Sequence, residues 1–150
     1  MRIRRFHEKD RARYLELAHA FYHSPAVLHP IPTKYFDRTF EEIIRSNAYA
    51  DGFFFEMDDG ETAGYALVSR MFSQECGGFA MWVEELSVLP KYQNQGIGKA
   101  FFDFLPNYYP ECKRFRLEVE RDNKKAIALY ERMGYSEMEY YQMVLDCVEE

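Results

Sequence analysis

One stretch decides the fold: Trp82-Val-Glu-Glu-Leu-Ser-Val-Leu-Pro-Lys-Tyr-Gln-Asn-Gln-Gly-Ile-Gly-Lys99. Its aliphatic first half predicts a strand that ends before Pro90, because proline has no N–H to donate to a sheet. Apolar residues then recur at helical spacing from Ile97 onward. The first N–H groups of a helix have no partner within it, and glycines at 96 and 98 let a bulky anion approach them closely. The stretch therefore predicts a strand, a glycine turn and a helix that together bind an anion such as a pyrophosphate.

The glycine spacing excludes two common phosphate-binding motifs. A dinucleotide fingerprint would need a third glycine where the chain has Phe101, and no Gly-Lys-Ser/Thr of a P-loop follows. The longer string Gln93-x-x-Gly96-x-Gly98, placed after a strand that ends in Val-x-Pro, resembles the acyl-CoA loop of the GNAT N-acetyltransferase superfamily, Arg/Gln-x-x-Gly-x-Gly/Ala. The resemblance implies acetyl-CoA as the cosubstrate, no metal, and a cofactor-binding set of Val88, Gln93, Asn94, Gln95, Gly96, Ile97, Gly98 and Lys99.

A second string resembles the other signature of the same superfamily. Asn123-Lys-Lys-Ala-Ile-Ala-Leu-Tyr130-Glu-Arg-Met-Gly134-Tyr135 follows the pattern Asn-x-x-Ala-x-x-Leu-Tyr-x-x-x-Gly-Phe, with Tyr135 in place of the phenylalanine. Asn123 and Tyr130 are two helical turns apart, so we expect both to point the same way. The resemblance implies that Asn123 contacts the pantetheine arm and that the Tyr130 hydroxyl faces the thioester sulfur.

The chemistry implied by this resemblance is acetyl transfer to a primary amine. Such an amine is cationic at neutral pH and must lose a proton before it attacks. Glu84 lies twelve positions before Gly96, where family members often carry a carboxylate base, and Glu85 is the weaker candidate for base or substrate contact. Strand parity places Glu84 on a face with Trp82 and Leu86, unless a β-bulge exchanges the faces. Ordered water is the alternative base, and Tyr130 is the expected proton donor to the leaving thiolate.

The acceptor pocket is less well defined by the sequence. In the family, the loop between the first two helices and the turn before the central strand usually shape this pocket, here residues 22–32 and 73–78. His23 and His29 in the first loop are weak candidates for substrate contact, because a loop histidine usually has no catalytic role. The acidic residues near the predicted site favour a small cationic amine.

Length and composition indicate one ordinary globular domain over residues 1–150. A net charge of −6 argues against nucleic acid, so we interpret the 13 Phe and 12 Tyr as core and pocket rings. Three scattered cysteines and no apolar run of membrane length indicate a cytoplasmic protein without membrane attachment. The sequence does not decide the oligomeric state, and both a monomer and a homodimer are compatible with it.

The predicted fold is α/β, with a mixed, mostly antiparallel sheet of six to seven strands and about four helices. We expect Thr33 to cap the second helix, Pro106 and Pro110 to break the chain after the third, and Gly134 to end the fourth. Residues 140–148 are expected to form a last strand, with 135–138 as a possible partner.

Three other functions stay open beside the small-amine acetyltransferase. A catalytically weak CoA-binding sensor would keep the glycine loop without the chemistry, and a peptide or protein acetyltransferase would differ only in its acceptor. A structural or interaction module could use the aromatic surface and would not bind CoA.

Overall fold

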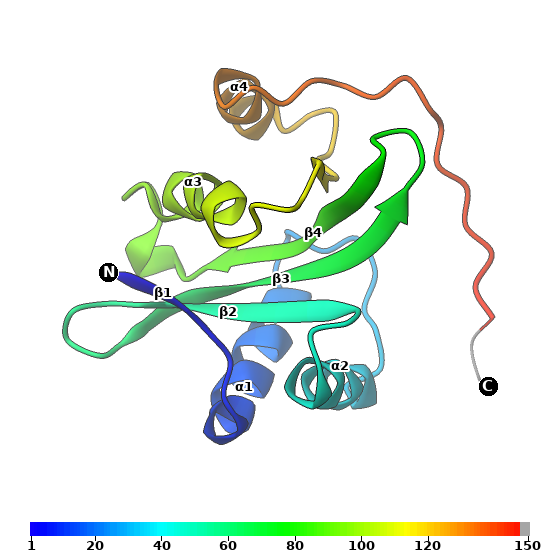
Figure 1. The fold of residues 1–150 in the computed structure, drawn as a ribbon. Helices are drawn as coiled ribbons and strands as arrows, with labels where there is room; N and C mark the ends of the chain where they lie inside the picture. Colours follow the sequence, from blue (N-terminus) through cyan, green and yellow to red (C-terminus); the bar gives the residue numbers. More distant parts are fainter. Residues whose placement is uncertain (148–150) are drawn as a thin grey trace. The chain divides into compact units, whose positions relative to one another are not determined.

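The computed structural model describes residues 1–147, and the chain divides after Glu118 into two compact units. The first unit, Met1–Glu118, contains the whole sheet and three α-helices; the second begins at Val119 and contains α4 (Figure 1). Each unit is described by itself. In chain order the elements are β1 (Arg2–Arg5), η1 (Glu8–Asp10), α1 (Arg11–Tyr22), α2 (Lys34–Arg45), β2 (Ala50–Glu56), β3 (Thr62–Ser73), β4 (Gly78–Val88), η2 (Pro90–Tyr92), α3 (Ile97–Tyr108), β5 (Arg114–Leu117) and α4 (Lys124–Arg132), where η marks a short 3-10 helix.

Within residues 1–147 the sheet has five strands, in the order β1-β2-β3-β4-β5. The first four pair antiparallel, and β5 runs parallel to β4. A mixed α/β fold with four α-helices is thus confirmed, but the expected six to seven strands are wrong. Residues 135–147 form no helix or strand, and Val148 of the expected last strand lies outside the described residues. The tyrosines and valine of this segment favour a strand only where another strand pairs with them, and sequence does not show that pairing.

The core lies on both faces of the sheet, and aromatic rings dominate it. On one face α1 and α2 pack against Phe54 and Tyr65, and on the other α3 packs against Phe53 and Phe55 (Figure 1). Phe53 and Phe55 are fully buried, and the ring of Phe101 on α3 lies 6.0 and 5.6 Å from theirs. The prediction that the aromatic residues form a core is confirmed for these rings.

Two expected helix boundaries need correction. Thr33 occupies the N-cap position of α2, but its backbone is already helical and its side chain makes no capping hydrogen bond. Pro106 does not break α3, which continues to Tyr108. Proline removes one backbone hydrogen bond, whereas Phe101, Phe102 and Leu105 are buried along the same helix. Tertiary packing therefore holds the last turn in place.

A β-bulge in β4 changes which of its side chains share a face. Glu85 pairs with Leu67 and Val83 pairs with Val68, so Glu84 is the extra residue of the bulge. The parity prediction is therefore wrong: Leu86 pairs with Ala66 and Trp82 with Ser69, three residues apart on β3, which puts Trp82 and Leu86 on opposite faces. The pairing of β3 with β4 creates the bulge, and the sequence of β4 alone does not reveal it.

A buried ion pair ties β1 to the start of α1 and allows a stability test. The Arg4 guanidinium donates to both Asp10 oxygens, at 2.7 and 3.1 Å, and the side chains are 16% and 8% exposed. Burial alone would raise the pKa of Asp10, but the hydrogen bonds from Arg4 and from the His7 N–H lower it. We expect Asp10→Asn to lower the free energy of unfolding by about 3 kcal/mol in urea titrations.

The effect of Asp10→Asn should depend on pH in a defined direction. Because the folded-state pKa is lowered, the loss should be complete above the ordinary aspartate value of 3.8 and disappear as pH falls through the folded-state pKa. Asp37→Asn, which removes an exposed partner of Arg11, is the control and should change stability little. Equal effects of the two variants would contradict a special role for the buried pair.

Candidate active site

The glycine loop has the backbone geometry that its sequence predicts. α3 begins at Ile97, and Gly96 caps it with a φ of 81°, the left-handed conformation that glycine adopts without strain. Asn94 also has a positive φ, 61°. This turn leads the chain from η2 into the helix, so that the first N–H groups of α3 point out of the loop. The predicted strand, glycine turn and helix start are confirmed.

Side chains within the loop hold it in this form. The Gln93 amide donates to the Val88 carbonyl at 2.9 Å, and the Gln95 amide donates to the Lys91 carbonyl at 3.1 Å. Ile97 is 4% exposed and anchors the helix start in the core. A Cβ placed on Gly98 would meet only Leu86, at 3.5 Å, so the fold itself does not require glycine at this position. The loop is thus held by side-chain hydrogen bonds, residues 93–96 are exposed, and the space beside Gly96 is free, as a phosphate site needs.

The other residues predicted to bind the cofactor differ in what their side chains contact. Asn94 and Lys99 are exposed, and the Lys99 ammonium pairs with Asp103 one turn along α3 at 2.6 Å. Val88 ends β4, and its carbonyl accepts the Gln93 bond. Their contacts with acetyl-CoA stay predictions.

A half-buried carboxylate lies on the same strand that leads into this loop. The two oxygens of Glu85 on β4 each accept a tyrosine hydroxyl, from Tyr22 at 2.6 Å and from Tyr65 at 2.7 Å. Tyr22 is the last residue of α1, and Tyr65 lies on β3. The bulge places Glu85 opposite Leu67, on the face that α1 and α2 cover. Residues of α1 and β3 therefore partly cover the Glu85 carboxylate and hydrogen-bond both of its oxygens.

This environment shifts the titration of Glu85. Burial raises the pKa of Glu85 above the usual glutamate range, and the charge of Glu84 acts in the same direction. The hydrogen bonds from Tyr22 and Tyr65 oppose the rise, because hydroxyl donors stabilise the anion. Tyr22 and Tyr65 themselves have raised pKa values, chiefly through burial, so both stay protonated donors. A carboxylate with a raised pKa is a stronger base than an ordinary glutamate, which favours a role in proton uptake.

The neighbouring Glu84 has a different setting. It is exposed, and its carboxylate accepts the Ser69 hydroxyl at 2.6 Å. Because Ser69 and Leu67 lie two residues apart on β3, the bulge puts Glu84 and Glu85 toward the same face of the sheet. The structure thus brings both predicted carboxylates together, with Glu84 exposed and Glu85 half-buried.

The two predicted histidines do not join this cluster. The His23 ring lies 4.1 Å from the His19 ring, and its Nδ1 bonds the His19 carbonyl at 2.7 Å. These contacts give His23 a local role at the end of α1. His29 is exposed in the loop between α1 and α2. Their roles in substrate binding stay untested.

Asn123 and Tyr130 belong to the second unit. The Asn123 side chain accepts the Ala126 N–H at 3.2 Å and so caps α4, while Gly134, with a φ of 90°, follows the helix end. Tyr130 is half-buried, its ring lies 6.1 Å from that of Tyr135, and burial raises its pKa. A protonated hydroxyl is what a proton donor requires.

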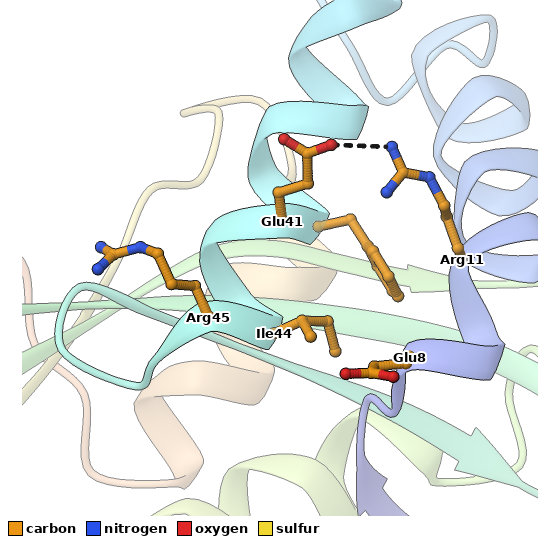
Figure 2. A pocket seen from close by; sticks show the side chains of 6 residues that line it. Glu8, Arg11, Glu41, Ile44 and Arg45 are labelled. Atoms are coloured by element: carbon orange, nitrogen blue, oxygen red, sulfur yellow. Dashed lines mark hydrogen bonds and ion pairs between the residues drawn. The ribbon is translucent and has the colours of Figure 1, made fainter.

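A shallow hollow elsewhere on the first unit contains none of the predicted site residues. Its volume is about 330 Å³, and both Arg11 and Glu41 line it. The Arg11 guanidinium donates to the Glu41 carboxylate at 3.2 Å, and Figure 2 shows the two side chains pointing toward each other. The charged side chains that line this hollow are two glutamates and two arginines, and none of them is a candidate catalytic residue. Within residues 1–147, no cluster of three or more His, Cys, Asp or Glu is placed to hold a metal ion, and no helix is long and apolar enough to cross a membrane.

Sequence reasoning missed the tyrosines around Glu85. Residues 22, 65 and 85 come from three elements far apart in the chain, and no local pattern connects them. The only available signal was the abundance of tyrosine together with a possible bulge, and neither identifies a partner.

Comparisons with known proteins agree with this architecture. The chain is 27% identical over 82 residues to the spermine/spermidine N(1)-acetyltransferase of Bacillus subtilis (strain 168), covering 51% of this chain and 54% of that protein. It is 28% identical over 112 residues to the thialysine N-epsilon-acetyltransferase of Mus musculus, covering 65% of each chain. The matched part thus spans less than two thirds of these relatives.

A solved structure shows the same fold at low sequence identity. AAC(6')-Iy, in complex with the bisubstrate analog CoA-S-monomethyl-acetylneamine, superposes with a TM-score of 0.77 at 17% identity over 98% of both chains. The model of the Acetyltransferase (GNAT) family matches residues 12–135, which include both predicted signatures. The chain therefore belongs to the GNAT acetyltransferase family.

Proposed function

We propose that this protein is an N-acetyltransferase that moves the acetyl group of acetyl-CoA directly to a primary amine of a small cationic molecule. The observation that carries the proposal is on β4: this strand bears the half-buried Glu85 and ends three residues later at Val88, from which η2 leads directly into the glycine loop. A proton acceptor and an anion-binding helix start thus lie on adjoining segments. Family membership and the activities of the two relatives, a spermine/spermidine and a thialysine N-acetyltransferase, support the same reaction.

The residues divide the reaction into binding and proton transfer. The backbone N–H groups from Gly96 to Lys99 would hold the pyrophosphate, with the macrodipole of α3 adding to the attraction. Acetyl-CoA supplies the acetyl group as a thioester. Glu85 takes one proton from the acceptor ammonium, and the free amine nitrogen then bonds to the carbonyl carbon. The nitrogen releases its second proton to solvent as the C–S bond breaks. Tyr130 gives its proton to the departing thiolate and regains one from solvent.

The charges around Glu85 support a cationic acceptor. Glu84 and Glu85 lie toward one face of β4, and the protein carries a net charge of −6. Glu75, in the turn between β3 and β4, contributes less to the attraction of a cation, because its carboxylate pairs with Arg114 at 3.1 Å. A cation near two carboxylates is favoured, whereas an acidic acceptor would be repelled. The unpaired thiols of residues 76, 112 and 147 fit work in a reducing cytoplasm.

Two measurements separate this function from the alternatives. Titration calorimetry with acetyl-CoA should give binding that a plain interaction module would not show. A thiol-release assay across small diamines, amino acids, aminoglycosides and peptides should then give turnover, fastest with the cationic small amines. Binding without turnover on any amine would indicate a sensor, and peptides as the best substrates would indicate a peptide acetyltransferase.

The proposed acid can be tested by removing one hydroxyl. Tyr130→Phe keeps the ring, so we expect packing and acetyl-CoA affinity to change little while kcat falls about 10- to 100-fold. Pre-steady-state kinetics must first show that chemistry limits the rate. An unchanged kcat under that condition would make Tyr130 a packing residue.

A further inference from the structure

We propose that Tyr22 is a positioning residue: its hydroxyl fixes the Glu85 carboxylate against the end of α1 and sets the pH range in which that carboxylate takes the acceptor's proton. This inference rests on the proposed function, and it assigns to α1 a part in the reaction that neither sequence signature includes.

The geometry distinguishes Tyr22 from the second tyrosine. Tyr65 is fully buried on β3, and its ring packs edge-on against Tyr14 at 5.5 Å. It is a fixed part of the core. Tyr22 is only partly buried, and its ring contacts Phe21 at 5.6 Å and Phe36 of α2 at 5.1 Å. The Tyr22 hydroxyl therefore links the carboxylate to the junction of α1, α2 and the loop between them.

The hydrogen bonds leave Glu85 able to react. Each carboxylate oxygen has two lone pairs, and each receives one tyrosine hydroxyl, so one lone pair on each oxygen can still accept a proton. Two donors on two oxygens also hold the carboxyl plane in one orientation. Such fixation is what a base needs in order to meet a bound ammonium without reorganising.

The groups around Glu85 determine in which direction its pKa should change when the Tyr22 hydroxyl is removed. The groups that act on it are Tyr22 from α1, Tyr65 from β3 and Glu84 from β4. Tyr14 of α1 also interacts with Glu85, and Asp37 of α2 acts on Tyr14. Among these, the two hydroxyl donors stabilise the anion, whereas burial and the negative groups disfavour it. Loss of the Tyr22 hydroxyl should therefore make Glu85 bind its proton more tightly.

The pH dependence of Tyr22→Phe tests this assignment. The acid limb of kcat/KM should move upward by about one pH unit, because a hydrogen bond to a charged group contributes about that much. The plateau reached at high pH should stay within a few-fold of wild type, since the ring and its packing remain.

Tyr109→Phe is the matched control: it removes another buried tyrosine hydrogen bond, to Asp51 at 2.5 Å, on the opposite face of the sheet. Tyr109→Phe should not move the acid limb of the kcat/KM profile.

A second readout does not depend on turnover. Carbon-13 NMR of the glutamate carboxyls, assigned with Glu85→Gln, should show the Glu85 titration shifted upward in Tyr22→Phe and unchanged in Tyr109→Phe. An unshifted titration would overturn the role of Tyr22, even in an active enzyme. A shifted titration in a protein that acetylates no amine would instead refute the proposed function while keeping the contact. An acid limb that moves equally in both variants would show a general loss of stability and would overturn the proposal.

Discussion

Replacing Glu85 by glutamine should lower turnover at neutral pH by about 10²- to 10⁴-fold, the usual contribution of a general base. Glutamine keeps the size of the side chain, and its carbonyl oxygen can still accept one tyrosine hydroxyl, while its NH2 group faces the other tyrosine oxygen as a donor. It cannot take a proton. Part of the rate should return as pH rises, because more of the acceptor amine is then already neutral. A pH–rate profile with a saturating amine measures both effects.

Glu84→Gln is the matched control for this variant. It removes the same charge one residue away, at an exposed position, and should change turnover by only a few-fold, partly through weaker attraction of a cation. If Glu84→Gln instead loses the rate and Glu85→Gln does not, the roles are reversed. If both variants keep normal profiles, ordered water is the base.

A stability measurement guards against a folding artefact in Glu85→Gln. The folded-state pKa of Glu85 lies above the ordinary value of 4.5, so the folded protein holds this proton more tightly than the unfolded chain does. Glu85 therefore reduces stability progressively as pH rises from 4.5 through its folded-state pKa. Glutamine removes that loss, so the variant should be at least as stable as wild type at pH 7. A rate loss in a stable variant is then a loss of chemistry.

The second large effect is expected at the glycine loop. Gly98→Val should weaken acetyl-CoA binding by about 100-fold or more, because a branched side chain would keep the pyrophosphate from the N–H groups of the first turn of α3. Two lost hydrogen bonds to a charged group are enough for this effect. Titration calorimetry with acetyl-CoA gives the affinity directly.

Gly98→Ala provides the graded control. Its single methyl meets Leu86 at an ordinary 3.5 Å, so the fold should accept it, and binding should weaken much less than with valine. Circular dichroism and thermal unfolding should show both variants folded. A folded Gly98→Val protein that binds acetyl-CoA as tightly as wild type would contradict the assignment of the loop.

Local chemistry made the glycine loop predictable. Pro90 ends the strand, Gly96 supplies the positive φ, and Ile97 starts the apolar periodicity, all within a few residues of one another. The same holds for Asn123, which caps α4, and for Gly134 beyond its end. Each of these depends on backbone preferences that neighbouring residues determine. The family signatures lie on the same segments.

The acidic site was only partly predictable, because distant elements build it. The sequence points to two adjacent carboxylates, but parity alone chose the wrong face pattern, since the bulge at Glu84 depends on the pairing of β4 with β3. The hydroxyls of Tyr22 and Tyr65 come from another helix and another strand. The prediction of a strand after residue 135 was wrong for the same reason: strand propensity does not specify which neighbouring strand would pair with the segment.

The most direct test of the central claim is a product analysis with acetyl-CoA and the fastest amine of the panel. Mass spectrometry should show an amine that has gained one acetyl group, and the amount formed should equal the free thiol released. The Glu85→Gln protein should make far less of both at neutral pH. Thiol release without an acetylated amine, or an equal yield from the Glu85→Gln protein, would contradict direct acetyl transfer assisted by Glu85.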